Sequence, residues 1–252
     1  MNPPLLEVNK ICYSVRGKQI LTDISFSLNE NEILGIAGDS GSGKSTLAKI
    51  LAGILKPDSG KFLLKGKLPA NNEYPIQILF QNNGDLLNPF RTVDSMLKDG
   101  LRFSTLNNGD GDEWIKEKFD LLDLKNELLS RKGYQLSGGE CQRIALCRAL
   151  TANPKVLILD EPSSAQDIEA SAKIVELIKN LKNKLNLTLI IISHELSFLR
   201  KTSDKIIILS VGEIIEAGTT SDVLTNPNHE HTQFLLKAES YNLTEDELKS
   251  NL

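Results

Sequence analysis

A glycine-rich loop near the N-terminus constrains the fold of this chain more than any other stretch. It reads Gly38-Asp39-Ser40-Gly41-Ser42-Gly43-Lys44-Ser45-Thr46 and fits the pattern G-x-x-x-x-G-K-[ST]. An apolar segment at 32–37 precedes it, and apolar residues recur at helical spacing from Leu47 to Ile54. Strand, glycine loop and helix in this order predict a phosphate site, because loop amides and a helix N-terminus face the anion. We expect Lys44 to reach the β- and γ-phosphates of a nucleotide and Ser45 to bind Mg²⁺.

Length and charge set broad limits on the function. The chain has 252 residues and a net charge of −4, with no block of basic residues, so nucleic-acid binding is disfavoured as its main role. Its three cysteines form no C-x-x-C pair, which favours free thiols in a reducing compartment. No N-terminal signal pattern is visible, and apolar runs such as 189–192 are far shorter than the ~20 residues of a membrane helix. We expect a soluble chain whose membrane role, if any, comes through a partner.

The segments around the loop differ in character. Residues 5–30 are predicted to form antiparallel strands, and apolar and polar side chains alternate in 24–29, as in a half-buried strand. Tyr13 lies there, either as an ordinary sheet aromatic or as a platform for adenine, and spacing alone leaves both interpretations open. Residues 82–135 are rich in Asn, Gly, Asp and Leu, with helical patterns near 92–101 and 113–124. This change predicts an inserted helical region.

A second glycine pair opens a helix far along the chain, in Leu136-Ser137-Gly138-Gly139-Glu140. Ser137 and Glu140 match a capping box, which explains both residues structurally. The box does not explain Gly138 and Gly139, because each glycine costs about 1 kcal/mol against alanine inside a helix. Bare glycines at a helix N-terminus allow close approach of an anion, so a second phosphate contact is the functional interpretation.

Two later strands end in candidate catalytic residues. The apolar run 156–160 ends in Asp160, and Glu161 follows at the edge where open α/β sheets bind ligands. Asp160 could hold the water shell of Mg²⁺ and Glu161 could orient the attacking water, whereas the structural alternative is a helix cap or a solvated turn. The next buried strand, 188–193, ends at His194; a lone histidine is usually structural, but this position favours a polar role. Between these strands, the pattern of residues 167–185 predicts an amphipathic helix. After the second strand, residues 205–216 resemble a hairpin around Gly212.

These motifs, in this order, resemble those of the ATP-binding cassette (ABC) ATPases over nearly the whole chain. Residues 38–45 match Walker A, 136–140 resemble the LSGGQ signature with Glu140 in place of glutamine, and 156–161 resemble Walker B with its catalytic glutamate. Gln81 matches the Q-loop glutamine, and residues 164–167 resemble the D-loop with Gln166 where leucine is usual. His194 matches the switch histidine, followed here by Glu195 rather than the more usual aspartate.

The resemblance implies an α/β fold. It has a P-loop (RecA-like) parallel-sheet core, an N-terminal antiparallel β subdomain and an inserted α-helical subdomain at about 82–150, all within a single ABC ATPase domain of residues 1–252. It also implies ATP hydrolysis with ATP and Mg²⁺. Glu161 then polarises water, His194 senses the γ-phosphate, and Tyr13 stacks on adenine. Phosphate is bound by residues 38–46, with Lys44 foremost, and by Ser137, Gly138 and Gly139. Mg²⁺ is bound by Ser45, Gln81 and Asp160.

Two further stretches are similar to the peptide/nickel importer branch of the family. The first is residues 80–82 followed by 87–93, and the second is residues 215–218 with 226–232. The segment 226–232 departs from the branch's usual His-Pro-Tyr-Thr. His229 and His231 lie in the second stretch, and we expect surface residues there rather than a metal site, since further ligands are missing. The resemblance leaves the cargo open among peptides, nickel, other metals and metal chelates.

The resemblance also implies partners. ATP is sandwiched between the Walker motifs of one chain and the signature of a second ATPase subunit, which in this branch is a different chain. Two integral membrane permease subunits and an extracytoplasmic solute-binding protein complete the importer, which places this chain at the cytoplasmic face of the membrane. A soluble ABC ATPase of DNA repair or translation is the alternative, but such proteins usually carry two cassettes or a long coiled coil. A small kinase or GTPase would leave Ser137, Gly138 and Gly139 unexplained.

Overall fold

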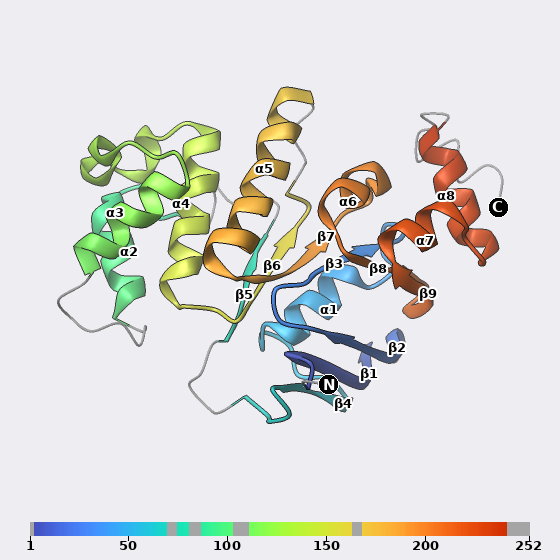
Figure 1. Cartoon of the computed structure of the whole chain (residues 1–252). Helices are drawn as coiled ribbons and strands as arrows, with labels where there is room; N and C mark the ends of the chain where they lie inside the picture. The colour runs from blue at the N-terminus through green and yellow to red at the C-terminus, as the bar shows by residue number, and fades with distance from the viewer. Residues whose placement is uncertain (1–2, 70–74, 81–86, 103–110, 163–167, 241–252) are drawn as a thin grey trace.

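Two sheets of different character organise the chain (Figure 1). The computed structural model describes residues 3–69, 75–80, 87–102, 111–162 and 168–240. The larger sheet has the strand order β5-β6-β7-β3-β8-β9. Its members are β5 (Ile76–Leu79), β6 (Val156–Asp160), β7 (Thr188–Ile192), β3 (Ile33–Ala37), β8 (Lys205–Ser210) and β9 (Glu213–Thr219). Neighbouring strands are parallel except for β9, which runs antiparallel to β8 at the edge.

The central strands are buried on both faces. Every residue of β3, β6 and β7 is buried, as expected for parallel strands covered by other layers on each side. Along β6 the side chains alternate, so that Leu157 and Leu159 belong to one hydrophobic core and Ile158 to the other. The continuous apolar runs in the sequence therefore reflect two cores, one on each side of the same sheet.

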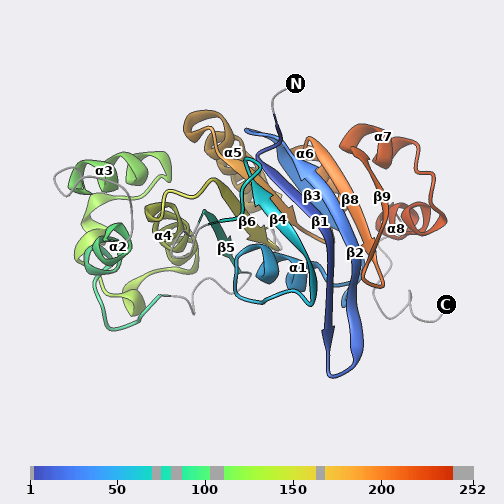
Figure 2. The same ribbon diagram turned by 90° about the horizontal axis from the view of Figure 1, so that it is seen from below.

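The smaller sheet is N-terminal and antiparallel, as predicted for residues 5–30. Its order is β2-β1-β4, with β1 at Leu6–Val15, β2 at Lys18–Leu28 and β4 at Ser59–Leu64. Figure 2 shows these strands beside helix α1 (Lys44–Leu51). Leu47 and Ile50 of α1 share one core with Leu21 of β2 and with the central strands. The predicted helical spacing extends too far, because α1 ends at Leu51 and Ile54 is 55% exposed.

Helices cover the other face of the large sheet. Helix α5 (Ile168–Leu185) buries Ile178 and Leu181 against it, which confirms the predicted amphipathic helix over the described side chains. Helix α6 (Leu196–Thr202) packs beside α5 and against β3, and the sequence patterns did not predict it. Beyond β9 follow α7 (Thr220–Thr225) and α8 (Glu230–Ser240), on the side opposite the helical region (Figure 1).

The predicted helical region is confirmed as a group of helices set to one side of the large sheet (Figure 1). It contains α2 (Val93–Leu101), α3 (Gly111–Leu121), α4 (Gly138–Thr151) and the short 3₁₀ helices η2 (Asn126–Ser130) and η3 (Gly133–Gln135). Leu97, Phe119 and Ile144 are fully buried among these helices, and their core continues into that of the sheet. The group is therefore packed onto the sheet rather than held by linkers alone.

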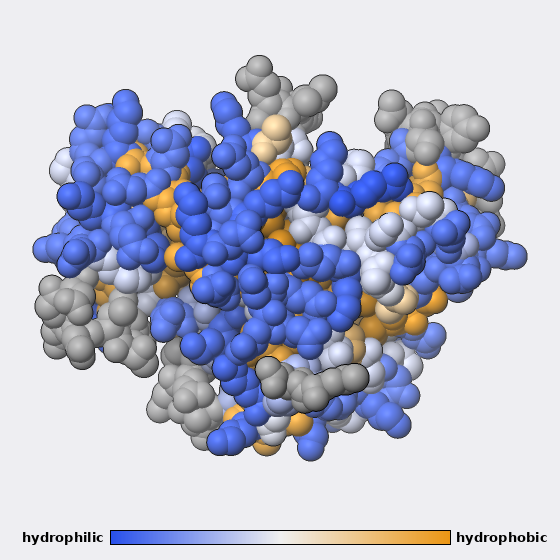
Figure 3. Space-filling model, in the orientation of Figure 1, coloured by the Kyte–Doolittle hydropathy of each residue, from blue (hydrophilic) through white to orange (hydrophobic). Residues whose placement is uncertain are grey.

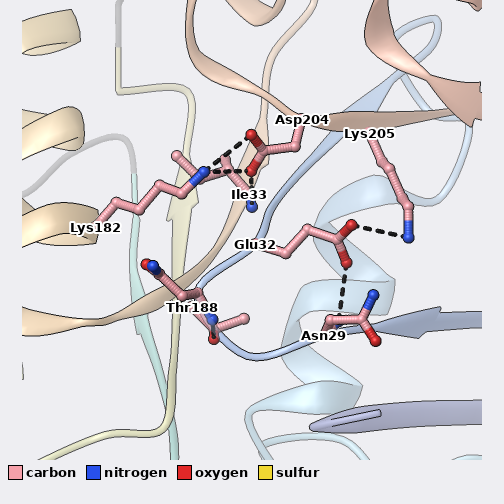
Figure 4. A network of polar contacts seen from close by, with 8 residues as sticks. Asn29, Glu32, Ile33, Lys182, Thr188, Asp204 and Lys205 are labelled. Carbon is pink, nitrogen blue, oxygen red and sulfur yellow. Dashed lines mark hydrogen bonds and ion pairs between the residues drawn. The ribbon is translucent and has the colours of Figure 1, made fainter. Parts of the chain in front are cut away.

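A polar network joins the amino-terminal ends of the central strands (Figure 4). The carboxylate of Asp204 accepts hydrogen bonds from Lys182 Nζ of α5, at 2.7 and 2.9 Å, and from the amide of Ile33, at 2.7 Å. Glu32 forms an ion pair with Lys205 at 2.8 Å. These contacts connect α5, β3 and β8 at the amino-terminal ends of the strands. The carboxyl ends of the strands are left for a ligand.

The outer surface is mainly polar. Hydrophilic residues cover most of the face in Figure 3, with hydrophobic areas between them. Within the described part of the chain, no helix is both long enough and apolar enough to span a lipid bilayer.

Candidate functional site

The carboxyl ends of three neighbouring strands form the site. Ile36 of β3 lies in register with Ile192 of β7, and Ile192 with Asp160 of β6. The segments that follow these strands therefore meet at one edge, as open α/β sheets require. A cavity of about 590 Å³ opens there. Its lining residues are Ile20, Ser40, Gly41, Gly43, Lys44, Ser45, Thr46, Asp160, Glu161 and His194.

Glycines in the phosphate loop, residues 38–46, are needed where other backbone lies close. Gly38 has φ of +143°, and a Cβ there would lie 1.9 Å from the carbonyl oxygen of Leu209. Gly43 has φ of +107°, and a Cβ would lie 2.6 Å from Leu21 Cδ2. The loop is also fixed from outside, since Gly212 of the β8–β9 turn donates a hydrogen bond to Ser42 O at 3.1 Å. The shape of the loop is thus set by β2 and by the β8–β9 hairpin.

Lys44 is held inside the loop. It is 9% exposed, and its ammonium donates hydrogen bonds of 2.7 Å to the carbonyl oxygens of both Gly38 and Asp39. Charge-assisted bonds of this kind keep the long side chain extended along the loop. The predicted lysine therefore stands at the wall of the cavity with its cation already oriented by the backbone.

Asp160 and Ser45 supply oxygen atoms to the same cavity. Asp160 is 8% exposed, and burial raises the pKa of its carboxyl, while a hydrogen bond with the Ser45 hydroxyl acts in the opposite direction. A buried carboxylate beside a hydroxyl is a donor set of the type that Mg²⁺ prefers. The residues therefore fit the predicted metal, and a bound cation would offset the cost of burying the charge.

Glu161 and His194 are in direct contact within the site. Nδ1 of His194 lies 2.9 Å from Oε2 of Glu161. This contact raises the pKa of His194, and it does so against the opposing effect of burial. Glu161 has φ of +52°, a left-handed conformation that is costly for a residue with a Cβ, and its amide donates to Ile192 O at 2.9 Å. A strained residue held by strand hydrogen bonds at a ligand edge is typical of functional sites.

A buried serine positions the histidine, and the sequence analysis did not single it out. Ser193 is fully buried; its amide donates to Ile36 O at 3.2 Å, and its Oγ accepts from the amide of Glu195 at 3.1 Å. These bonds fix the turn that carries His194 beyond β7. Ile20 of β2 is a second lining residue that was missed, because no local motif marks it.

The signature segment, residues 136–140, lies away from this cavity. All five of these residues are described, and none of them lines it. Ser137 caps α4 as predicted: its Oγ accepts from the amide of Glu140 at 3.3 Å, and the Glu140 carboxylate accepts from the amide of Ser137 at 2.7 Å. Hydrogen bonds from the Ser137 amide and hydroxyl lower the pKa of Glu140. The N-terminus of α4 is therefore not bare, because it already carries a carboxylate, although a Cβ at Gly138 would meet open space.

The structure leaves three predicted contacts as predictions. Tyr13 of β1 is half-buried and pairs with Leu21, whose neighbour Ile20 lines the cavity, but Tyr13 itself is not a lining residue. Gln81 and the stretch 164–167 lie outside the described residues.

Comparison with known sequences decides the family. The profile of the ABC transporter family matches residues 21–164, which include the phosphate loop, the signature segment and the Walker B strand. This chain belongs to the ABC transporter family. It is accordingly an ATPase that uses ATP and Mg²⁺.

Named relatives come from peptide transport systems. The oligopeptide transport ATP-binding protein OppF of Streptococcus mutans is 34% identical over 93% of this chain and 81% of its own length. The dipeptide transport ATP-binding protein DppF of Haemophilus influenzae is 35% identical over 86% of this chain and 69% of its own. Among solved structures, the ATP-binding cassette MJ0796, a dimer in a post-hydrolysis state with ADP and Pi, has a TM-score of 0.73 at 25% identity. That alignment covers 85% of this chain and 98% of the other.

Proposed function

We propose that this chain is the ATPase subunit of an importer for peptides. The convergence of Lys44, Asp160, Glu161 and His194 on one cavity, within a chain of this family, carries the proposal. The cargo is inferred from the relatives, which are an oligopeptide and a dipeptide transport protein. Because these named relatives transport peptides, peptides are favoured over nickel and metal chelates, which the branch resemblance also allows.

The cavity suggests a division of labour in ATP hydrolysis. The loop amides and Lys44 bind the phosphates, and Lys44 would exchange its bonds to Gly38 O and Asp39 O for phosphate oxygens. Glu161 polarises the attacking water. His194 now pairs with Glu161 at 2.9 Å and would turn toward the γ-phosphate, which frees the carboxylate for catalysis.

Ser45 and Asp160 would hold Mg²⁺, together with Gln81. When bound, the ion supplies positive charge against the β- and γ-phosphate oxygens. The chain's own contribution is to keep the Asp160 carboxylate buried and hydrogen-bonded to Ser45, so that two oxygen donors already face the cavity.

The position of the signature segment supports a composite site between two chains. Ser137, Gly138 and Gly139 stand outside the cavity, so they would meet nucleotide held by a second ATPase subunit, which we propose to be a different chain. The related cassette MJ0796 was solved as a dimer. Tyr13 would stack on the adenine of this chain's own nucleotide. We further propose that residues 1–252 form one ATPase domain in which about 82–150 is the helical subdomain.

Two membrane permease subunits and an extracytoplasmic solute-binding protein would complete the importer, with this chain at the cytoplasmic face of the membrane. The described part of the chain carries no helix that could span a membrane. The contact surface would lie near Gln81 and the helical region.

Reconstitution tests the cargo. The chain is purified with the membrane subunits that bind it, placed in proteoliposomes with the cognate solute-binding protein, and assayed for ATP hydrolysis with short peptides or with Ni²⁺. Peptides should stimulate hydrolysis and enter the vesicles, and a complex containing Glu161→Gln should do neither. Stimulation by Ni²⁺ but not by peptides would refute the peptide assignment.

A further inference from the structure

The C-terminal helix contacts the phosphate loop through a histidine. His231 lies in the first turn of α8, and its Nε2 is 2.7 Å from Oδ2 of Asp39. Asp39 is the second residue of the phosphate loop. The two residues are remote in sequence, and no motif of the family resemblance joins them.

The histidine side of this contact is largely removed from solvent. The His231 side chain is 20% exposed, and its Nε2 atom is buried. A buried polar nitrogen without a partner costs free energy, so the carboxylate of Asp39 has a defined role as its neighbour. The Asp39 side chain is 45% exposed.

The start of α8 is fixed by strand β9. The carboxylate of Glu216 accepts hydrogen bonds from the amides of Asn228, at 2.7 Å, and His229, at 3.3 Å. Burial alone would raise the pKa of Glu216, but the nearby Thr232 hydroxyl and the hydrogen bonds from these two amides outweigh it and hold the pKa below its ordinary value. Glu216 is thus a charged cap on the first turn, which favours the helix.

The imidazole of His231 is also packed within its own helix, since its ring lies against that of Phe234, with 6.1 Å between centroids. The backbone amide of His231 donates to Nδ1 of His229, the residue before the helix, at 3.1 Å. Thr232, the next residue, is fully buried. The side chain therefore reaches Asp39 from a support that does not belong to the phosphate loop.

Asp39 is a sensitive position within that loop. Its carbonyl oxygen accepts from Lys44 Nζ at 2.7 Å and from the Ser42 amide at 3.2 Å. A shift of Asp39 would move the carbonyl that orients the lysine. A carboxylate turned into the cavity would also repel the phosphates, whereas one drawn toward His231 is kept aside.

We propose that His231 is a positioning residue for ATP binding: it holds Asp39 so that the phosphate loop keeps its shape and presents Lys44. The inference rests on the proposed role of residues 38–46 as the phosphate site. This contact also links α8 to the phosphate loop, so that a displacement of α8 would displace Asp39.

Binding of ATP with Mg²⁺ to the full chain tests the proposal by calorimetry, with steady-state turnover as a second readout. His231→Ala should raise the Kd and KM for ATP about three- to tenfold, the range for losing one partly buried polar contact, with kcat nearly unchanged. His231→Gln, which keeps a polar donor, should recover much of the loss. Lys237→Ala, an exposed position on the same helix, is the matched control and should match the parent chain.

A double-mutant cycle with Asp39→Asn shows whether the two residues act as a pair. The double variant should lose no more affinity than the worse single variant. Fully additive losses, an unchanged KM in His231→Ala, or an equal fall in kcat would overturn the positioning role. Lys44→Ala separates this result from the site assignment: if it leaves ATP affinity intact, the phosphate site itself is wrong, whereas loss in Lys44→Ala without any loss in His231→Ala rejects His231 alone.

Discussion

At the scale of single residues, the chemistry depends on a few side chains whose neighbours set their state. Glu161 and His194 come from different strands and share one ion pair of 2.9 Å. Glu161 is mostly buried and His194 is 67% exposed, so the histidine is the partner that can leave. This asymmetry suits a carboxylate that must act on water and a histidine that must respond to phosphate.

Replacing Glu161 with glutamine tests the first of these roles. Glu161→Gln keeps the shape of the side chain but removes the charge that polarises water, so turnover should fall by at least about 10²-fold. ATP affinity should stay close to that of the parent chain, since Lys44 and the loop amides are unchanged. Single-turnover hydrolysis and calorimetry measure the two quantities. Hydrolysis near the parent rate would remove Glu161 from the catalytic role.

The pH dependence of stability tests the pair with His194. Glu161 raises the pKa of His194 above its ordinary value of 6.5, so the folded state binds the proton more tightly than the unfolded state. The pair therefore stabilises the fold fully below about pH 6, and this contribution disappears as pH rises through the raised pKa. Because His194 is largely exposed, the effect should stay below about 1 kcal/mol.

Urea unfolding of the nucleotide-free chain at several pH values measures this contribution. The difference between the parent chain and His194→Ala should be largest at acidic pH and shrink toward alkaline pH. Glu161→Gln should lose the same pH-dependent part. A difference that grows with pH would contradict the ion pair.

Several site residues were predictable from local sequence, and others were not. Lys44 and Ser45 follow from one motif because a glycine loop followed by a helix admits few geometries. Ser193, Ile20 and His231 enter through strand register and helix docking, which place residues remote in sequence beside the loop. No short pattern encodes such contacts.

At the scale of elements, caps determine where helices begin. Ser137 and Glu140 exchange hydrogen bonds at the start of α4, and Thr92 accepts from the Ser95 amide at the start of α2. Capping signals are local, so the start of α4 could be predicted. Helix α6 has only seven residues, a length at which the spacing of its buried side chains does not distinguish helix from strand.

The α4 cap leads to a stability prediction. Ser137→Ala removes the acceptor for the Glu140 amide and should lower the free energy of unfolding by about 1 kcal/mol. Glu140→Gln is the matched control, because glutamine keeps the reciprocal bond to the Ser137 amide, and its loss should be smaller. Chemical unfolding monitored by circular dichroism measures both. Equal stability of Ser137→Ala and the parent chain would show that the cap contributes little.

At the scale of the whole molecule, the order of the strands assembles the site. The family resemblance predicted a parallel sheet, but the sequence did not show that β3 lies between β7 and β8. That order follows from crossover connections and from two cores that fill simultaneously on both faces of the sheet. It brings the carboxyl ends of β3, β6 and β7 together at the cavity. The start of α4 lies outside this cavity. Of the predicted phosphate contacts, residues 38–46 are therefore separated from residues 137–139 within one chain.

Because the phosphate loop and the signature segment are separated, Lys44→Ala and Ser137→Arg should have different effects. Lys44 lines the cavity, so Lys44→Ala should abolish ATP binding by the isolated chain. Ser137 lies outside it, so Ser137→Arg should leave that affinity nearly intact while placing a bulky cation at the start of α4. In the assembled complex, Ser137→Arg should instead reduce hydrolysis at the site whose Walker motifs belong to the second ATPase. The isolated parent chain should turn over slowly, because its cavity lacks the donors that a partner's signature adds around the transferring phosphate. Calorimetry on the single chain and turnover in the complex decide the matter: equally severe loss of ATP binding by both isolated variants would mean that the signature acts within its own chain.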